Sequence, residues 1–115
     1  MKSVTEEDPI RIEELRRMAA ARFGDLVKGV VDLERRILLV DADLQADQQA
    51  ELLQGGSRQA DLWGINLYPD HPESDWIEFD SMINLRPSSG DASRGVDDPA
   101  IRARIVALVR SLIIR

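Results

Sequence analysis

Two segments of the chain alternate hydrophobic and polar residues with a period of two. The first runs from Leu62 to Tyr68 and the second from Trp76 to Arg86. This period is typical of a strand with one buried face and one polar face. The connection between the segments, PDHPESD, contains two prolines, which favour a loop. We therefore predict an antiparallel hairpin with a long loop, around which the rest of the chain is organised.

A second hairpin is predicted nearer the N-terminus. The segments Leu26–Leu33 and Arg36–Val40 are rich in β-branched and aliphatic residues, and a short polar link, Glu34–Arg35, joins them. Such composition favours strands, and a link this short favours antiparallel pairing.

The first helix is predicted over Ile12–Phe23, where apolar residues recur at helical spacing. Gly24 follows as a natural end. Two starts are compatible with the sequence: either Asp8 and the proline after it cap the helix, or Pro9–Arg11 is extended. The polar and acidic segment Met1–Asp8 is predicted to be frayed.

The second helix is predicted to begin at Asp43 or Asp47 and to end at Gly55-Gly56, with Ala50 and Leu53 facing inward.

The last helix has the clearest start, because Asp98 is a preferred N-cap residue and Pro99 suits the first helical position. Its apolar stripe is broad and consists of Ile101, Ile105, Val106, Leu108, Val109, Leu112 and Ile113. A helix this apolar either packs between two surfaces or shares one with another subunit.

These elements predict an α+β fold in the order α-β-β-α-β-β-α. We expect a four-stranded antiparallel sheet of two hairpins, with helices on one face. A length of 115 residues corresponds to one domain, residues 1–115, with a single modest core.

Composition narrows the functional classes. The chain has no cysteine, which excludes disulfides, thiol catalysis and cysteine metal sites. A net charge of −6 argues against binding to nucleic-acid phosphates. No apolar run approaches the roughly 20 residues of a bilayer span, and the N-terminus has no secretory hydrophobic region. We expect a cytoplasmic protein without membrane contact.

The first candidate site is the polar face of the central hairpin. Glu78 and Asp80 lie two residues apart on one strand, so their carboxylates could hold a divalent cation or divide acid and base roles. The alternative is a solvated or helix-covered face in which Arg86 pairs with Asp80. The ligand-binding residues predicted on this face are Asn66, Tyr68, Glu78, Asp80, Asn84 and Arg86.

The second candidate site is the loop from Arg86 to Asp98, which adds Ser88, Ser93 and Arg94 to the predicted ligand-binding residues. Hydroxyls, glycine amides and arginines can hold an anion. No P-loop motif is present, and acidic residues already occupy the start of the following helix. The alternative is that an arginine of the loop pairs with Asp97 or Asp98.

No catalytic motif is recognisable. His71 is the only histidine, and no Ser-His-Asp constellation, HExxH or GxGxxG is present. One histidine also excludes a histidine-rich metal site. We therefore predict no catalytic residue, metal ligand or cofactor, and an enzyme would have to use carboxylates, serines, Tyr68, Lys28 or arginines.

Three functions are compatible with these patterns. The preferred hypothesis is a non-enzymatic module that binds a protein or a small anionic ligand through the polar sheet face and the 86–98 loop. The second is a metal-dependent hydrolase or nuclease acting through Glu78 and Asp80. The third is a structural subunit that forms a homo-oligomer, such as a homodimer through the last helix or an edge strand.

Three segments also resemble a known family: VVDLERRILLV, GSRQADLWGINLYP and WIEFDSMINLRPSSGDASRGVDDPAIR. They are similar to DUF5674, small bacterial proteins of unknown function, over about residues 10 to 113, and LWGxNLYP and FDSMINxRP are motifs specific to it. The family pattern has an asparagine–arginine pair before Arg94, where this chain has Asp91-Ala92-Ser93, which weakens a site on that segment. The resemblance implies a single cytoplasmic domain and carries over no activity.

Overall fold

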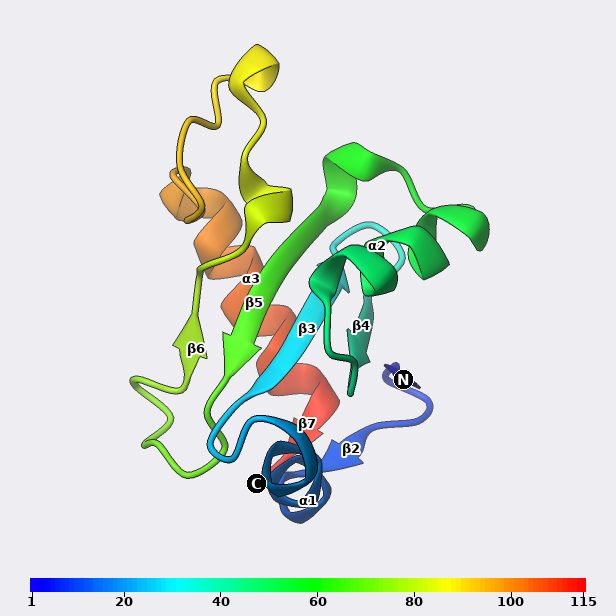
Figure 1. The fold of residues 1–115 in the computed structure, drawn as a ribbon, viewed down its shortest axis with the longest axis vertical. Coiled ribbons are helices and arrows are strands. Elements are labelled where there is room, and N and C mark those ends of the chain that lie inside the picture. Colours follow the sequence, from blue (N-terminus) through cyan, green and yellow to red (C-terminus); the bar gives the residue numbers. More distant parts are fainter.

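A five-stranded antiparallel sheet, ordered β1-β4-β3-β5-β6, forms the centre of the computed structural model, which describes residues 1–115 (Figure 1). Its strands are β1 (Lys2–Val4), β3 (Val27–Asp32), β4 (Ile37–Val40), β5 (Leu62–Leu67) and β6 (Ile77–Glu78). A small second sheet pairs β2 (Ile10–Arg11) in parallel with β7 (Ile113–Ile114). The fold class is therefore α+β, and both predicted hairpins are present.

Helices cover both faces of the sheet. The α-helices are α1 (Ile12–Arg22), α2 (Gln45–Gln54) and α3 (Pro99–Leu112). In Figure 1, α2 lies in front of the sheet and α3 behind it. The expectation of helices on one face was wrong, because β5 is buried along its whole length on both faces. None of the three helices has the length and hydrophobicity that a bilayer span requires.

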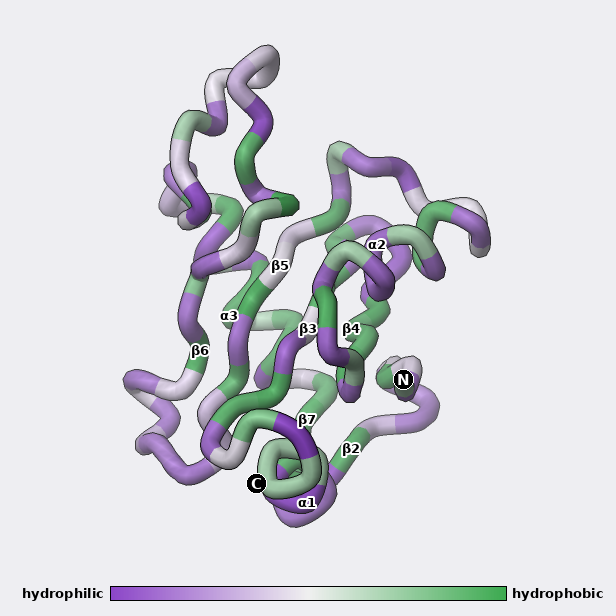
Figure 2. The backbone as a smooth tube through the Cα atoms, in the orientation of Figure 1, coloured by the Kyte–Doolittle hydropathy of each residue, from purple (hydrophilic) through white to green (hydrophobic).

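The two faces bury cores of different size. On the α3 side, 20 buried residues form the main cluster, to which β5 contributes Trp63, Ile65 and Leu67. On the α2 side, four buried residues form a smaller cluster: Val30, Leu39, Leu52 and Leu62. Figure 2 shows hydrophobic positions along β3 and β5 with a few hydrophilic ones between them.

The N-terminal segment is ordered as an edge strand. The prediction that residues 1–8 are frayed was wrong, because Lys2–Val4 pairs with β4 and Val4 is completely buried. This strand is why the sheet has five strands and not four. At the next element, the extended alternative is confirmed: Arg11 is the N-cap of α1 and has extended backbone. Gly24, at φ +94°, ends the helix as expected.

The second arm of the central hairpin is shorter than its alternation predicted. β6 ends at Glu78, and a short 3₁₀ helix, Met82–Asn84, follows, with Ser81 as its N-cap. Continued pairing along β5 is replaced by close packing of this segment against Gly64, where an added Cβ would lie 2.4 Å from Ser81 Oγ. Further 3₁₀ turns occur at Gln59–Asp61 and Pro87–Ser89.

The predicted start of α3 is confirmed, but the predicted inward face of α2 is not. Asp98 accepts a hydrogen bond from the Ala100 N–H at 2.8 Å and caps α3, as predicted. In α2, however, Gln48 is completely buried while Ala50 and Leu53 are exposed, so the predicted inward face was wrong. The reason is hydrogen bonding: Gln48 Nε2 donates to the Lys28 carbonyl at 2.9 Å across the helix–sheet interface.

Candidate functional site

The outer edge of β5 is closed by side chains beyond the point where β6 ends. The Asn84 amide accepts a hydrogen bond from the Gly64 N–H at 2.8 Å and donates to the Gly64 carbonyl at 3.0 Å. It also donates to the Arg94 carbonyl at 2.9 Å. Asn84 is completely buried, so this predicted ligand-binding residue holds the strand edge and is not accessible to a ligand.

Arg86 continues the same arrangement at the end of β5. Its guanidinium donates to the Leu62 carbonyl and, at 3.4 Å, to the Ala60 carbonyl, and it lies over the Trp63 ring at 4.3 Å from the centroid. Burial lowers the pKa of Arg86, and the charges of nearby aspartates oppose this shift. The expected Arg86–Asp80 pair was wrong, because Arg86 takes part in none of the ion pairs.

Three of the predicted polar residues meet on the sheet face that α2 partly covers. Glu78 Oε1 accepts hydrogen bonds from Asn66 Nδ2 at 2.8 Å and from the Tyr68 hydroxyl at 3.2 Å. Asn66 in turn accepts from Gln45 Nε2 of α2 at 3.2 Å. Burial raises the pKa of Tyr68, and the negative charge of Glu78 and its hydrogen bond raise it further. Both hydrogen bonds are accepted by Oε1 of Glu78.

Asp80 is engaged separately, by the arginine of the loop. Arg94 Nε donates to Asp80 Oδ1 at 2.7 Å, and both side chains are about half exposed. The alternative in which a loop arginine pairs with Asp97 or Asp98 was therefore wrong. Glu78 and Asp80 do not form a free carboxylate pair, and a divalent cation at Asp80 would have to displace Arg94. No group of three or more potential metal-ligating side chains is present.

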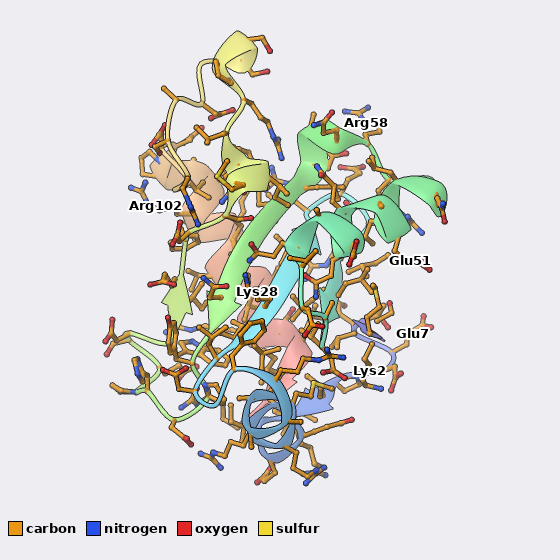
Figure 3. All side chains as sticks on the ribbon, viewed as in Figure 1. Lys2, Glu7, Lys28, Glu51, Arg58 and Arg102 are labelled. Carbon is orange, nitrogen blue, oxygen red and sulfur yellow. The ribbon has the colours of Figure 1, made fainter.

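A groove opens on the same face, between the start of α2 and the 3₁₀ helix Met82–Asn84. Its volume is about 240 Å³. We call it the Lys28 groove, and it is lined by Lys28, Leu44, Gln45, Ala46, Ser81, Met82, Ile83 and Arg94. Figure 3 shows Lys28 on the sheet face in front, the side on which α2 lies.

The charge of this groove differs from that of the other four pockets. Its lining contains two cations and no carboxylate, whereas each of the other four pockets includes at least one acidic residue. Two of its apolar residues are unusually exposed for their size: Leu44 at 56% and Met82 at 61%. The groove therefore combines the unpaired cation of Lys28, and an arginine paired with Asp80, with accessible apolar surface.

The predicted serines lie away from this groove. Ser93 Oγ donates to Asp97 Oδ1 at 2.7 Å and accepts from the Gly95 N–H at 3.2 Å, so its hydroxyl organises the turn before α3. Ser88 lies in a separate pocket of about 570 Å³ beside Arg86, which we call the Arg86 pocket.

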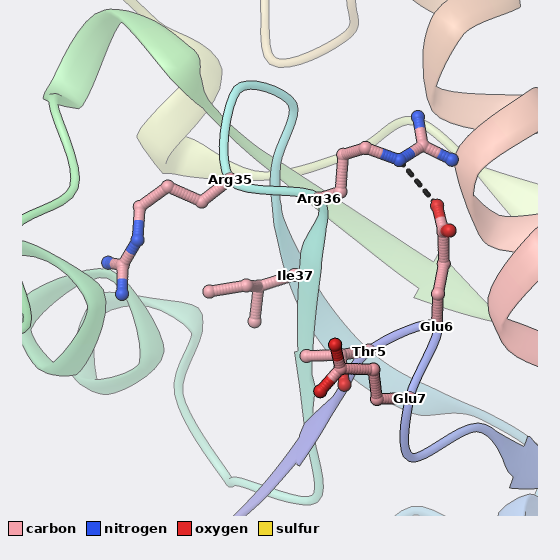
Figure 4. A pocket seen from close by; sticks show the side chains of 6 residues that line it. All are labelled: Thr5, Glu6, Glu7, Arg35, Arg36 and Ile37. Carbon is pink, nitrogen blue, oxygen red and sulfur yellow. Dashed lines mark hydrogen bonds and ion pairs between the residues drawn. The ribbon is translucent and has the colours of Figure 1, made fainter.

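One further hollow, of about 600 Å³, had no sequence signal because residues 1–8 were expected to be frayed. It is lined by Thr5, Glu6, Glu7, Arg35, Arg36 and Ile37 (Figure 4). Arg36 Nε donates to Glu6 Oε1 at 2.6 Å, and Arg35 points away toward Ser57, to which it donates at 2.8 Å. Three of its four charged residues are thus engaged, whereas Glu7 is exposed and forms no ion pair.

Fold and site define a small α+β protein with a central antiparallel sheet, helices on both faces and a positively charged groove on one of them. Residues 4–112 match DUF5674, described as a protein of unknown function, and the chain belongs to this family. Comparison with curated proteins gives no match, and comparison with solved structures gives none.

Proposed function

We propose that this protein is a non-enzymatic binding module whose Lys28 groove takes a peptide segment of a partner protein, one that carries a carboxylate next to an apolar side chain. The observation that carries the proposal is the absence of acidic residues from the groove lining in a chain of net charge −6. An acidic ligand is repelled by most of such a surface, so a locally positive groove selects where it binds.

The two cations of the groove have unused binding capacity. Lys28 forms no ion pair, and its ammonium lies over the Phe23 ring at 5.3 Å. Arg94 uses only Nε for Asp80, so both of its terminal nitrogens are free to donate. A carboxylate of the ligand placed between Lys28 and Arg94 would receive charge-assisted hydrogen bonds from both.

The apolar side of the groove supports a peptide ligand. Leu44 is the N-cap of α2 and provides no side-chain cap, although serine, aspartate or asparagine would stabilise the helix there. Met82, on the facing 3₁₀ helix, is flexible and adapts to different apolar partners. Exposed apolar residues beside a charged groove are typical of a recognition surface.

The two other hypotheses have less support. For a metal-dependent hydrolase, the carboxylate of Asp80 would have to exchange Arg94 for a cation, and Glu78 already accepts two hydrogen bonds. For a homo-oligomer, the exposed Leu44 and Met82 could contact a second copy, and the experiment below distinguishes this case.

The test is binding of fluorescein-labelled peptides of alternating leucine and glutamate, measured by fluorescence anisotropy. We expect Lys28→Gln and Arg94→Gln each to weaken binding about tenfold, because each removes one charge-assisted contact. Lys2→Gln is the matched control, since Lys2 and Lys28 are the only lysines and Lys2 lies outside the groove. Added salt should also weaken binding.

Two results would contradict the proposal. One is equal affinity for a peptide of alternating leucine and lysine. The other is unchanged affinity in the Lys28→Gln/Arg94→Gln double variant. If sedimentation shows a dimer that Met82→Ser converts to monomer, the groove is a contact between copies and the homo-oligomer hypothesis replaces the peptide-binding one.

A further inference from the structure

The Arg86 pocket shares no residue with the Lys28 groove and has a different charge pattern. It lies between the 3₁₀ turn Gln59–Asp61, the segment that follows Ile83, and the first turn of α3. Its lining contains apolar and polar side chains in similar number: Gln59, Ala60, Trp63, Leu85, Arg86, Pro87, Ser88, Ser89, Asp91 and Ile101. A volume of about 570 Å³ is suitable for a small molecule.

Arg86 and Asp91 lie directly opposite each other in this pocket. The Arg86 N–H donates to the Asp91 carbonyl at 2.7 Å, and the Asp91 N–H donates to the Arg86 carbonyl at 3.0 Å. Gly90, at φ +85°, closes the turn between them. Residues paired in this way project their side chains from the same face, and both side chains line the pocket.

Their opposite charges nevertheless do not meet. No carboxylate oxygen lies within 4.0 Å of the Arg86 guanidinium. The guanidinium is held instead by the Leu62 and Ala60 carbonyls and by the ring of Trp63. Asp91 forms no ion pair with any other residue. A cation and an anion are thus held apart on one wall of the same pocket.

We infer that this pocket binds a small zwitterion, an α-amino acid, with its carboxylate toward Arg86 and its ammonium toward Asp91. An α-amino acid carries both charges on adjacent groups, so one molecule can bridge the separated pair. Each terminal nitrogen of Arg86 keeps a second N–H for a carboxylate. The hydroxyls of Ser88 and Ser89 can hydrogen-bond the ligand, and Leu85 and Ile101 provide apolar contact for its side chain.

The two charges also determine what the pocket rejects. A simple anion is attracted by Arg86 but repelled by Asp91. A simple cation is attracted by Asp91 but repelled by Arg86. Only a ligand with both charges satisfies both residues, and selection against the other two classes comes from the unmatched charge.

The experiment uses three probes with the same apolar body: phenylalanine, N-acetylphenylalanine, which is only anionic, and phenylalaninamide, which is only cationic. Titrations of the isotopically labelled protein are followed by NMR, with the amides of Ser88 and Ser89 locating the site. We expect phenylalanine to bind at least tenfold more tightly than either of the other two. If all three bind equally, or if none of the twenty amino acids shifts these amides, the inference is wrong.

Asp91→Asn provides the decisive variant, because Arg86 also holds the edge of β5 and its removal could unfold the protein. In Asp91→Asn the preference should change: phenylalanine should bind about tenfold more weakly, and N-acetylphenylalanine more tightly than in the wild type. Asp97→Asn, which removes the same charge outside the pocket, should leave all three affinities unchanged. An unaltered preference in Asp91→Asn would overturn the inference while leaving the Lys28 groove unaffected.

Discussion

The side-chain amide of Asn84 and the backbone of Gly64 form the pair of hydrogen bonds that a neighbouring strand would otherwise provide. Together with Arg86 at the Leu62 carbonyl and Glu78 opposite Asn66, this contact closes the outer edge of β5. A strand edge with free N–H and C=O groups would be a template for pairing with another chain. Here two side chains satisfy the edge beyond the end of a two-residue strand.

Replacing Asn84 by alanine should therefore destabilise the protein strongly. The buried Gly64 N–H and C=O would both lose their partner, and each unsatisfied buried group costs about 1–3 kcal/mol. We expect a loss of about 3 kcal/mol in the free energy of unfolding, measured by urea denaturation. Ser93→Ala, which removes two exposed hydrogen bonds, is the control and should cost about 1 kcal/mol. Similar losses for the two variants would show that the Asn84–Gly64 contact does not close the edge.

Gly64→Ala tests the packing of the same edge. The new Cβ would lie 2.4 Å from Ser81 Oγ and 2.5 Å from Ser81 Cβ, so the segment after β6 would have to move. We expect a loss of about 1–3 kcal/mol, as for other overpacked sites, and partial recovery in the Gly64→Ala/Ser81→Gly double variant.

Gly55→Ala is the control for this substitution. Gly55 has a φ of −79°, and an added Cβ would meet no atom closer than 3.5 Å. Its thermal midpoint should be unchanged or slightly higher than that of the wild type. A Gly64→Ala protein as stable as Gly55→Ala would mean that the 81–86 segment adapts without cost.

Leu44→Ser should separate stability from binding. Leu44 is mostly exposed, so its removal costs little burial, and serine can cap the free N–H groups at the start of α2. We expect a gain of about 1 kcal/mol in unfolding free energy together with weaker binding of the leucine–glutamate peptide. Leu53→Ser, at the other end of α2, should give neither effect. If the Leu44→Ser protein binds the peptide normally, Leu44 does not contribute to binding in the groove.

The single tyrosine provides a pH test of the Glu78 cluster. Burial and the neighbouring Glu78 raise the pKa of Tyr68 above its ordinary value of 10.0, so its ultraviolet titration should be displaced to higher pH. Because the folded protein holds this proton more tightly than the unfolded chain, the stabilisation is complete below pH 10 and falls as pH rises through the folded pKa. Glu78→Gln should lower the pKa of Tyr68, and Tyr68→Phe should lack the alkaline loss of stability.

Much of the fold could be predicted because its signals are local. The cap formed by Asp98, the glycine that ends α1 and the β-branched and aliphatic composition of β3 and β4 each depend on a few adjacent residues. Strand β1 could not be predicted, because three residues contain too little periodicity to stand out. Coverage of both sheet faces was missed because the buried positions on the α2 side of β5 include Gly64 and Asn66, which carry no hydrophobic signal.

The candidate site was predictable only in part, because its geometry depends on a change of backbone direction. Glu78, Asp80, Asn84 and Arg86 share one face only if the strand continues. Because a 3₁₀ helix follows Ser81, Asn84 instead lies at the edge of β5, and Arg86 lies beside Leu62 at the start of β5. The predicted residues are therefore divided between a hydrogen-bonded sheet face and a separate pocket. Lys28 was not among them, because its groove exists only once α2 and the 3₁₀ helix have packed against the sheet.

The parallel pairing of Ile10 with Ile113 joins residues separated by nearly the whole chain. Bringing such distant segments together costs more chain entropy than closing a local hairpin, so this contact is expected to form late, after β3 and β4 have paired. Substitutions that weaken it, such as Ile113→Val, should accelerate unfolding and leave the refolding rate nearly unchanged. The β2–β7 pair would then govern how long a folded molecule persists more than how quickly it forms.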